Sequence, residues 1–285
     1  MCQSPAAARR ARAAALAASL VVAAAGGSAA QTVADAASLP AAVTDVELIP
    51  GWRRDDGAHV AAIAIRLAPG WRTYWRAPGL NGVPPQFDWS GSTNLAAVSY
   101  EWPAPIVFDS YGEATPGYEQ ALVLPVILTP ARAEAPVGAA VDLFFGVCNE
   151  ICIPAETRLA ARLDPLAPPQ GKAEIERALA DRPLDARAGG VAAARCGLAP
   201  AEGGRRLTAE ITLDAPPGPG LVTVMEAPSR PDLWIGPART RVDGRRIQVA
   251  APLEAPGGLV ALDREGLRLT LLGDGRAIDI RGCSG

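Results

Sequence analysis

The sequence predicts an all-β protein with two immunoglobulin-like antiparallel β-sandwich domains joined by a short helical linker. Apolar and polar residues alternate with a period of two along most of the chain, as in strands with one buried face. Glycine (29 residues) and proline (27 residues) are scattered rather than repeated, which indicates many turns. One stretch, residues 172–180, has helical character, and it separates two strand-rich parts.

The first predicted domain covers residues 41–164. Period-two patterns place strands at residues 45–48, 59–67, 121–128 and 141–147. Farther on, Leu159, Ala161 and Leu163 alternate with Arg158 and Arg162. This alternation predicts a strand with one face toward solvent. Several such strands separated by turns favour an antiparallel sandwich.

The predicted linker covers residues 165–190. Its proline-rich start ends the strand pattern. Residues 172–180 then form the expected helix, in which Ile175, Ala178 and Leu179 make a narrow apolar stripe. Pro183 ends the helical pattern. The linker is therefore expected to be a helix whose apolar face can pack on one of the two domains.

The second predicted domain covers residues 191–285. Strand patterns recur at residues 207–213, 221–225, 267–271 and 277–280. The dipeptide Asp243-Gly244 is expected to form a two-residue hairpin turn. Residues 273–275 are expected to turn a second hairpin between the last two strands. These features predict a second sandwich.

Residues 1–30 look like a secretory signal peptide, with three arginines ahead of an apolar run at 13–25 and small residues at 28–30. Thirteen apolar residues are too few for an ordinary membrane span. The mature chain is expected outside the cytoplasm, with no segment inserted in a membrane. It would hold 24 basic and 30 acidic residues without a basic run, so nucleic-acid binding is not expected.

Cys148 and Cys152 are separated by only three residues. In an extended strand they would lie about 13 Å apart, too far for a disulfide, so they can pair only across a hairpin loop or a single helical turn. A bridge closing so short a loop removes little chain entropy and stabilises the fold weakly. An exposed, weak bridge is suited to thiol–disulfide exchange. An ordinary structural disulfide is the alternative.

Four cysteines follow the predicted signal peptide, and an even number in an oxidising compartment suggests two disulfides. Cys196 and Cys283 flank the strands of the second domain. A bridge between them would close about 88 residues and contribute roughly 4–5 kcal/mol in the chain-entropy model. We expect a structural disulfide there; a second redox pair is the alternative.

No cofactor or metal site is expected from the residues. The sole histidine, His59, lies in a strand-like apolar run, so neither a catalytic triad nor a histidine zinc site is favoured. Two reduced cysteines could bind copper(I) as soft thiolates. Neither Cys148 nor Cys152 has an adjacent basic residue that would lower its pKa, which suits an electron carrier better than a strong oxidant.

An aromatic segment at residues 70–79 contains Trp71, Tyr74 and Trp75. These side chains either cap the core of the sandwich or form a docking surface near the cysteines, where aromatic residues are favoured. Tyr111 lies in a glycine- and proline-rich loop that could also cover the site.

The order and spacing of several motifs resemble the N-terminal periplasmic domain of the thiol:disulfide interchange protein DsbD, and its ScsB-type relatives still more closely. The motifs are Gly70-Trp-Arg-Thr-Tyr-Trp75, Pro78-Gly79, Pro84-Pro85, Tyr111-Gly112, Tyr118, Leu124-Pro-Val126, Phe145-Gly-Val-Cys148 and Cys152-Ile-Pro154. The DsbD version has a longer gap between its cysteines and an aromatic cap just before its Tyr-Gly step. Ser110 holds that place here, so Phe108 and Tyr111 are the capping candidates.

The resemblance implies an immunoglobulin-like sandwich in the periplasm. It implies that Cys148 and Cys152 take electrons from a membrane thiol reductase of the DsbD or CcdA type and pass them to periplasmic thioredoxin-like proteins. It also implies that Cys152 forms the mixed disulfide. The sequence ends without a reductase domain of its own, so a separate donor is expected. The alternative is a non-catalytic periplasmic binding module for a protein partner or copper(I), with both disulfides structural.

Overall fold

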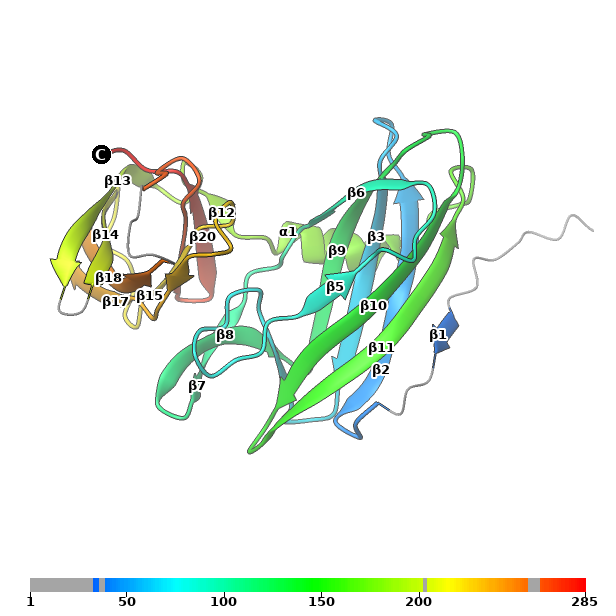
Figure 1. The fold of residues 1–285 in the computed structure, drawn as a ribbon, viewed down its shortest axis with the longest axis horizontal. Helices are drawn as coiled ribbons and strands as arrows, with labels where there is room; N and C mark the ends of the chain where they lie inside the picture. The colour runs from blue at the N-terminus through cyan, green and yellow to red at the C-terminus, as the bar shows by residue number, and fades with distance from the viewer. Residues whose placement is uncertain (1–32, 36–38, 202–203, 256–261) are drawn as a thin grey trace, which may run out of the picture.

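The computed structural model describes residues 33–35, 39–201, 204–255 and 262–285. In these ranges two β-rich lobes lie side by side, and one short helix, α1, lies on the first of them (Figure 1). The prediction of an all-β protein of immunoglobulin-like sandwiches is confirmed. The predicted signal peptide lies outside the described residues. No helix in the described ranges is long and apolar enough to cross a membrane.

The first sandwich consists of two antiparallel sheets. One has the order β1-β11-β10-β4-β8-β7, with β5 also paired to β10. Its strands are β1 (Val33–Asp35), β4 (Arg72–Tyr74), β5 (Gln86–Asp88), β7 (Ile106–Ser110), β8 (Glu113–Glu119), β10 (Val137–Cys148) and β11 (Cys152–Leu163). The other sheet has the order β2-β3-β9-β6, with strands β2 (Val43–Arg53), β3 (His59–Leu67), β6 (Leu95–Tyr100) and β9 (Ala121–Pro130).

The core of the first sandwich lies between the inner faces of these sheets. Leu48, Ile63 and Leu124 from one sheet and Leu143 and Phe145 from the other are fully or almost fully buried there. Alternate residues of β11 face outward and are exposed, as the period-two pattern predicted. Truncating a buried aromatic such as Phe145 to alanine typically costs about 3–5 kcal/mol, so this core anchors the β10–β11 hairpin.

The helix α1 (Lys172–Ala180) occupies the predicted residues and packs on the outer face of β2 and β3. Ile175 is fully buried against an apolar patch of those strands, which explains why β3 is buried on both faces. Glu174 also pairs with Arg66 of β3 at 2.9 Å. The linker helix is therefore part of the first lobe.

The second sandwich also has two sheets, and apolar side chains from both, such as Ile211 and Leu269, form its core. One sheet has the order β12-β20-β19-β15, with strands β12 (Leu184–Asp185), β15 (Val222–Glu226), β19 (Arg268–Gly273) and β20 (Arg276–Arg281). The other has the order β13-β14-β18-β16 with β17 also on β18, and strands β13 (Val191–Ala201), β14 (Gly204–Leu213), β16 (Trp234–Ile235), β17 (Arg239–Asp243) and β18 (Arg246–Glu254).

One of the two predicted hairpin turns is displaced by a residue. Asp274 and Gly275 have positive φ between paired Gly273 and Arg276, as expected for a two-residue turn. In the other hairpin Asp243 is itself paired with Arg246, so the loop is Gly244-Arg245 rather than Asp243-Gly244. The register places Ile247 of β18 in the core, and this burial overrides the local turn signal.

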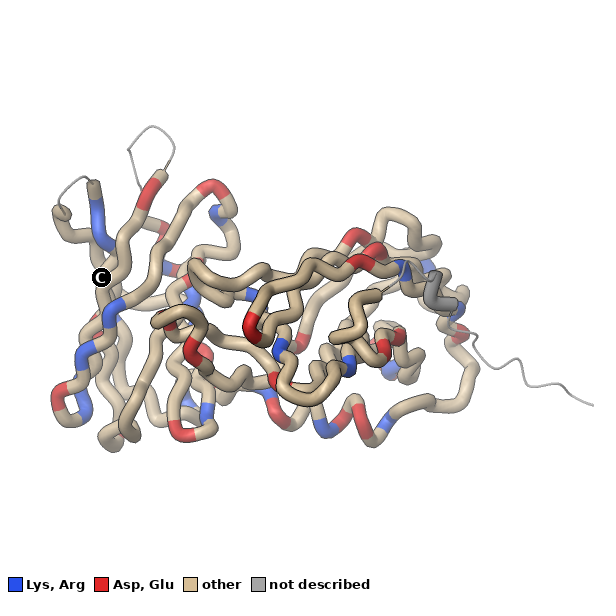
Figure 2. The backbone as a smooth tube through the Cα atoms, turned by 90° about the horizontal axis from the view of Figure 1, so that it is seen from below, with Lys and Arg blue, Asp and Glu red and all other residues tan. Residues whose placement is uncertain are grey.

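Basic and acidic residues are interspersed over both lobes, which lie side by side along the long axis of the molecule (Figure 2). Such a mixed surface lacks the one-sided basic footprint of a nucleic-acid-binding face in the part of the chain that the structure describes.

Candidate functional site: a cysteine pair at the end of a hairpin

The two closely spaced cysteines lie at the free end of the β10–β11 hairpin. Cys148 is the last residue of β10, Cys152 is the first residue of β11, and the register places them directly opposite each other. Residues 149–151 form the connecting loop, so the hairpin alternative of the sequence analysis is the one observed. Residues opposite each other in an antiparallel pair have Cα atoms about 4.5–5.5 Å apart, which lies within the range that a disulfide spans.

Both cysteines are free thiols in this structure, and their exposure differs. Cys148 is buried, with 5% of its surface exposed, whereas Cys152 is exposed. Cys152 is therefore the more accessible of the two residues.

The side chain of Tyr74, in β4, contacts the cysteine pair. Its ring is fully buried, and its hydroxyl lies 2.9 Å from Cys152 Sγ. Burial, reinforced by the neighbouring thiols, raises the pKa of Tyr74 well above its ordinary value, so the hydroxyl keeps its proton. A protonated hydroxyl can donate a hydrogen bond to a thiolate at Cys152, and a charged acceptor makes that bond strong.

Arg72 supplies a positive charge close to Cys148. It stands opposite Cys148 in the β10–β4 register. Burial raises the pKa of the Cys148 thiol, and the hydrogen bond with Cys152 acts in the same direction. The Tyr74 hydroxyl and the charge of Arg72 oppose this rise without cancelling it. Cys148 is therefore mainly a protonated thiol at neutral pH.

The β7–β8 hairpin covers the cysteine loop from one side. Tyr111 at its tip has a φ of 54° and donates a hydrogen bond from its hydroxyl to the carbonyl of Glu150 at 2.8 Å. Phe108 lies against Tyr74, with ring centroids 6.4 Å apart, and under the guanidinium of Arg72. Ser110 is buried, and its carbonyl accepts a hydrogen bond from Asn81 at 2.8 Å.

Cys148 lines a small cleft of about 130 Å³ between the two hairpins. Its lining includes Arg72, Phe108, Tyr111, Cys148 and Glu150. Two large side chains are exposed at this end of the lobe: Tyr111 beside the cleft and Ile151 in the connecting loop. Exposed apolar side chains of this kind offer a surface for contact with another protein.

The other predicted site residues have different places. Trp75 is fully buried in the first core, and Trp71 packs against the same core with part of its surface exposed. Cys196 and Cys283 are joined in a disulfide of the second lobe, with Cα atoms 5.7 Å apart. Among the described residues, no group of three or more His, Cys, Asp and Glu could hold a metal ion.

Arg72 and Asn81 are site residues that sequence reasoning missed. They lie far from Cys148 in the chain, and strand order alone brings β4 beside β10. Arg72 is part of the aromatic motif at 70–75, so a closer look at that motif could have identified it. Nothing in the local sequence marks Asn81.

Comparison with known proteins agrees with this geometry. Residues 45–164 match the family model of the N-terminal part of the thiol:disulfide interchange protein DsbD. The crystal structure of the N-terminal periplasmic domain of ScsB from Proteus mirabilis is similar, with a TM-score of 0.61 and 22% sequence identity. This match covers 90% of the present chain and 93% of that chain, so the shared fold extends over both lobes. No curated protein matches the sequence.

The fold and the site define an immunoglobulin-like sandwich that carries a cysteine pair at the end of one hairpin. The match of residues 45–164 to the family model of DsbD N-terminal domains confirms the resemblance that the motifs around Trp71, Tyr111, Cys148 and Cys152 predicted. The family is named for thiol–disulfide interchange, which is the chemistry that two adjacent free thiols can perform.

Proposed function

We propose that this protein is a periplasmic thiol–disulfide exchange protein that passes electrons from a membrane thiol reductase to thioredoxin-like partners through Cys148 and Cys152. The observation that carries the proposal is the pairing of these two free thiols across the end of a hairpin, with the Tyr74 hydroxyl 2.9 Å from Cys152 Sγ. A structural disulfide needs no tyrosine hydroxyl at its sulfur, whereas a thiolate nucleophile is stabilised by one.

The reduced pair would donate two electrons in two steps. The Cys152 thiolate attacks one sulfur of a partner's disulfide, which forms a mixed disulfide and releases the other partner sulfur as a thiolate that takes up a proton. Cys148 then loses its proton and attacks Cys152 Sγ. This step forms the Cys148–Cys152 bond and releases the reduced partner. The membrane reductase restores the dithiol by the reverse exchange.

Exposure supports this division of roles. Cys152 is exposed and lies beside the Tyr74 hydroxyl, whereas Cys148 is buried and its pKa is raised by that burial. The exposed side chains of Tyr111 and Ile151 at the hairpin end are suited to contact with a partner protein. The periplasmic location follows the family resemblance and the predicted signal peptide.

Trapping of a mixed disulfide tests the proposal. The Cys148→Ser variant, mixed with an oxidised thioredoxin-like periplasmic protein, should accumulate a covalent complex through Cys152, because no resolving thiol remains to release it. The Cys152→Ser variant should accumulate much less. Peptide mapping identifies the sulfur that is bonded.

Two outcomes would change the account. Trapping through Cys148 in the Cys152→Ser variant alone would reverse the roles of the two cysteines. Trapping by neither variant, across several thioredoxin-like proteins, would favour a binding module without exchange activity. A variant with both cysteines replaced by serine is the control for non-covalent association.

A further inference from the structure

The second lobe packs against the first through the outer face of its sheet β12-β20-β19-β15. Val224 and Glu226 of β15 stand opposite Thr270 and Arg268 of β19, so these side chains share one face. Thr270 is fully buried although it points away from the core of its own sandwich. Val224 packs against the core of the first sandwich. The face is therefore covered by the first lobe.

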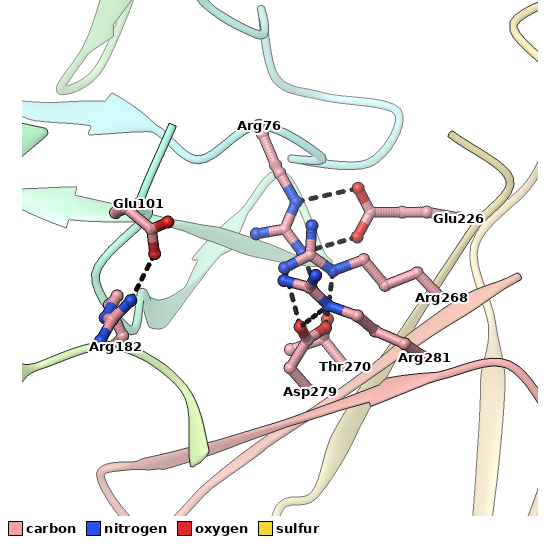
Figure 3. Close-up of polar contacts among 8 residues, drawn as sticks. All are labelled: Arg76, Glu101, Arg182, Glu226, Arg268, Thr270, Asp279 and Arg281. Atoms are coloured by element: carbon pink, nitrogen blue, oxygen red, sulfur yellow. Dashed lines mark hydrogen bonds and ion pairs between the residues drawn. The ribbon is translucent and has the colours of Figure 1, made fainter. Parts of the chain in front are cut away.

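A buried ion pair joins the lobes at this face. Arg76, in the loop after β4, makes a two-pronged contact with Glu226, in which Nε and Nη2 lie 3.0 and 2.8 Å from the two carboxylate oxygens. The side chains are only 13% and 16% exposed. Arg76 Nη2 also lies 3.4 Å from the Thr270 hydroxyl. Figure 3 shows the Arg76 side chain reaching across to Glu226 on the second lobe.

The neighbouring charges make Glu226 indispensable to this contact. Arg268 and Arg281 both pair with Asp279 (Figure 3). Together with Arg76, they make three guanidinium groups that share only two carboxylates, those of Glu226 and Asp279. Loss of the Glu226 carboxylate would leave a buried arginine beside other arginines with no counter-charge of its own. A buried charge without its partner is strongly unfavourable, so the contact would open.

A short covalent and packing path links Arg76 to the cysteine pair. Arg76 follows Tyr74 by two residues, and its guanidinium stacks on the buried Trp75 ring at 3.7 Å. Arg76 immediately precedes the loop formed by residues 77–85. Within that loop Gly82 lies so close to Tyr74 that a Cβ on it would stand 2.9 Å from the tyrosine ring. Asn81 of the same loop holds the backbone of Ser110 in the covering hairpin.

We propose that Glu226 is a positioning residue for the cysteine pair: through Arg76 the second lobe fixes the start of loop 77–85, and that loop holds Tyr74 at hydrogen-bond distance from Cys152. The inference deepens the proposed exchange function and rests on it, because it concerns the reactivity of the same sulfur. It gives the second lobe a role beyond linking or spacing, since without the Glu226 carboxylate the Tyr74 hydroxyl leaves its position beside Cys152 for part of the time.

Alkylation of Cys152 by iodoacetamide measures this effect without any partner protein. In a Cys148→Ser chain with the Cys196–Cys283 disulfide intact, Tyr74→Phe should lower the alkylation rate near pH 7 about tenfold, because a hydrogen bond to a charged group is lost. Glu226→Ala should lower it about threefold, since Tyr74 is displaced only part of the time. Both rates should approach that of the parent at alkaline pH, where the thiol ionises without help.

The pH dependence separates positioning from a change in access. The titratable and charged groups that face the pair are Arg72 and Tyr74 of β4, Asp109 and Tyr111 of the covering hairpin, Cys148, and Glu150 of the connecting loop. No hydrogen bond or ion pair of the described chain joins Glu226 to any of these groups. A loss of rate that is equal at every pH would mean altered access and would contradict the proposal.

A double variant provides the sharpest control. If Glu226 acts through Tyr74, Glu226→Ala should cause no further loss in the Tyr74→Phe chain, and the two effects should not add. Glu226→Asp should restore most of the rate, whereas Glu226→Gln, which keeps the shape without the charge, should behave like Glu226→Ala. Glu210→Ala removes an exposed ion pair with Arg246 in the same lobe and should leave the rate unchanged.

The inference and the proposed function fail separately. An unchanged alkylation rate in folded Glu226→Ala and Glu226→Gln chains would overturn the inference, even if Cys148→Ser still traps a thioredoxin-like partner. Additive losses in the double variant would overturn it as well. Failure of trapping together with a Tyr74-dependent loss in the Glu226 variants would remove the exchange function and leave the positioning role intact.

Discussion

The two cysteine pairs of this protein differ in almost every physical respect. Cys148 and Cys152 are four residues apart, end one hairpin and are free thiols, one of them exposed. Cys196 and Cys283 are 87 residues apart and are bonded, and they join β13 of one sheet to the segment that follows β20 of the other. The first pair lies beside a tyrosine hydroxyl and an arginine. The second lies among the apolar residues of a core.

The length of the loop that each bridge closes sets its contribution to stability. In the chain-entropy model a bridge across about 88 residues contributes roughly 4–5 kcal/mol, whereas one across five residues contributes about 2 kcal/mol. Reduction of the long bridge would therefore cost the fold much of its stability and is strongly unfavourable. The short bridge can be made and broken at small cost to the fold, which suits electron transfer.

Loss of the long bridge should have the largest effect on stability. Replacing both Cys196 and Cys283 by serine should lower the free energy of unfolding by roughly 4–5 kcal/mol, because about 88 residues of the unfolded chain are released. For a chain of this size the midpoint of thermal unfolding should fall by about 10 °C. Calorimetry of the variant and of the parent protein gives the difference.

The matched measurement concerns the short pair. Forming the Cys148–Cys152 bond should raise stability by no more than about 2 kcal/mol over the dithiol form. A larger gain from the short bridge than from the long one would remove the physical basis of the comparison. Peptide mapping without reduction verifies which bonds are present in each sample.

Gly146→Ala adds only one methyl group, but it should displace side chains beside the cysteine pair. A Cβ at this position would stand 2.9 Å from both the Tyr74 ring and Val83, so one of them must move. Overpacking of this kind costs about 1–3 kcal/mol, and displacement of Tyr74 should also slow alkylation of Cys152. Gly197→Ala in β13 is the control, because its Cβ would meet only Thr208 at an ordinary 3.5 Å. Equal effects of the two substitutions on alkylation would contradict the role of Tyr74.

The pH dependence of resolution should report the burial of Cys148. Burial raises the pKa of this thiol, so the thiolate fraction, and with it the release of a mixed disulfide, should reach half of its maximum above about pH 8.5, where an ordinary thiol is half ionised. The raised pKa of Cys148 also affects the stability of the reduced fold. The reduced fold should lose stability as pH rises through the raised pKa, because the folded state holds that proton more tightly. A release rate that reaches half of its maximum at or below about pH 8.5 would contradict this account.

Much of the fold could be predicted from local signals. The helix at residues 172–180 was predicted at its observed bounds, because proline and glycine residues flank it and its apolar stripe is clear. The turn at Asp274-Gly275 was also correct. The turn after Asp243 was displaced by one residue, because the register of β18 is fixed by burial of Ile247 across the sheet. Local turn signals do not contain that information.

The site was less accessible to sequence reasoning. The spacing of Cys148 and Cys152 required a turn but left its type open, and the assignment of Tyr74 as core or surface stayed undecided. The structure shows that Tyr74 is both buried and polar in its contact with Cys152. The Arg76–Glu226 contact joins residues 150 positions apart. Only the docking of one lobe on the other brings them together.

The reduction potential of the Cys148–Cys152 pair distinguishes a pair that exchanges disulfides from a structural disulfide. Equilibration of the protein with glutathione redox buffers, followed by mass spectrometry of the alkylated peptides, gives the potentials of both cysteine pairs in one experiment. The account predicts that Cys148–Cys152 titrates between about −120 and −270 mV, the range of proteins that exchange disulfides, while Cys196–Cys283 stays oxidised. A potential for Cys148–Cys152 below about −300 mV would identify it as a structural bond and would contradict the proposed function.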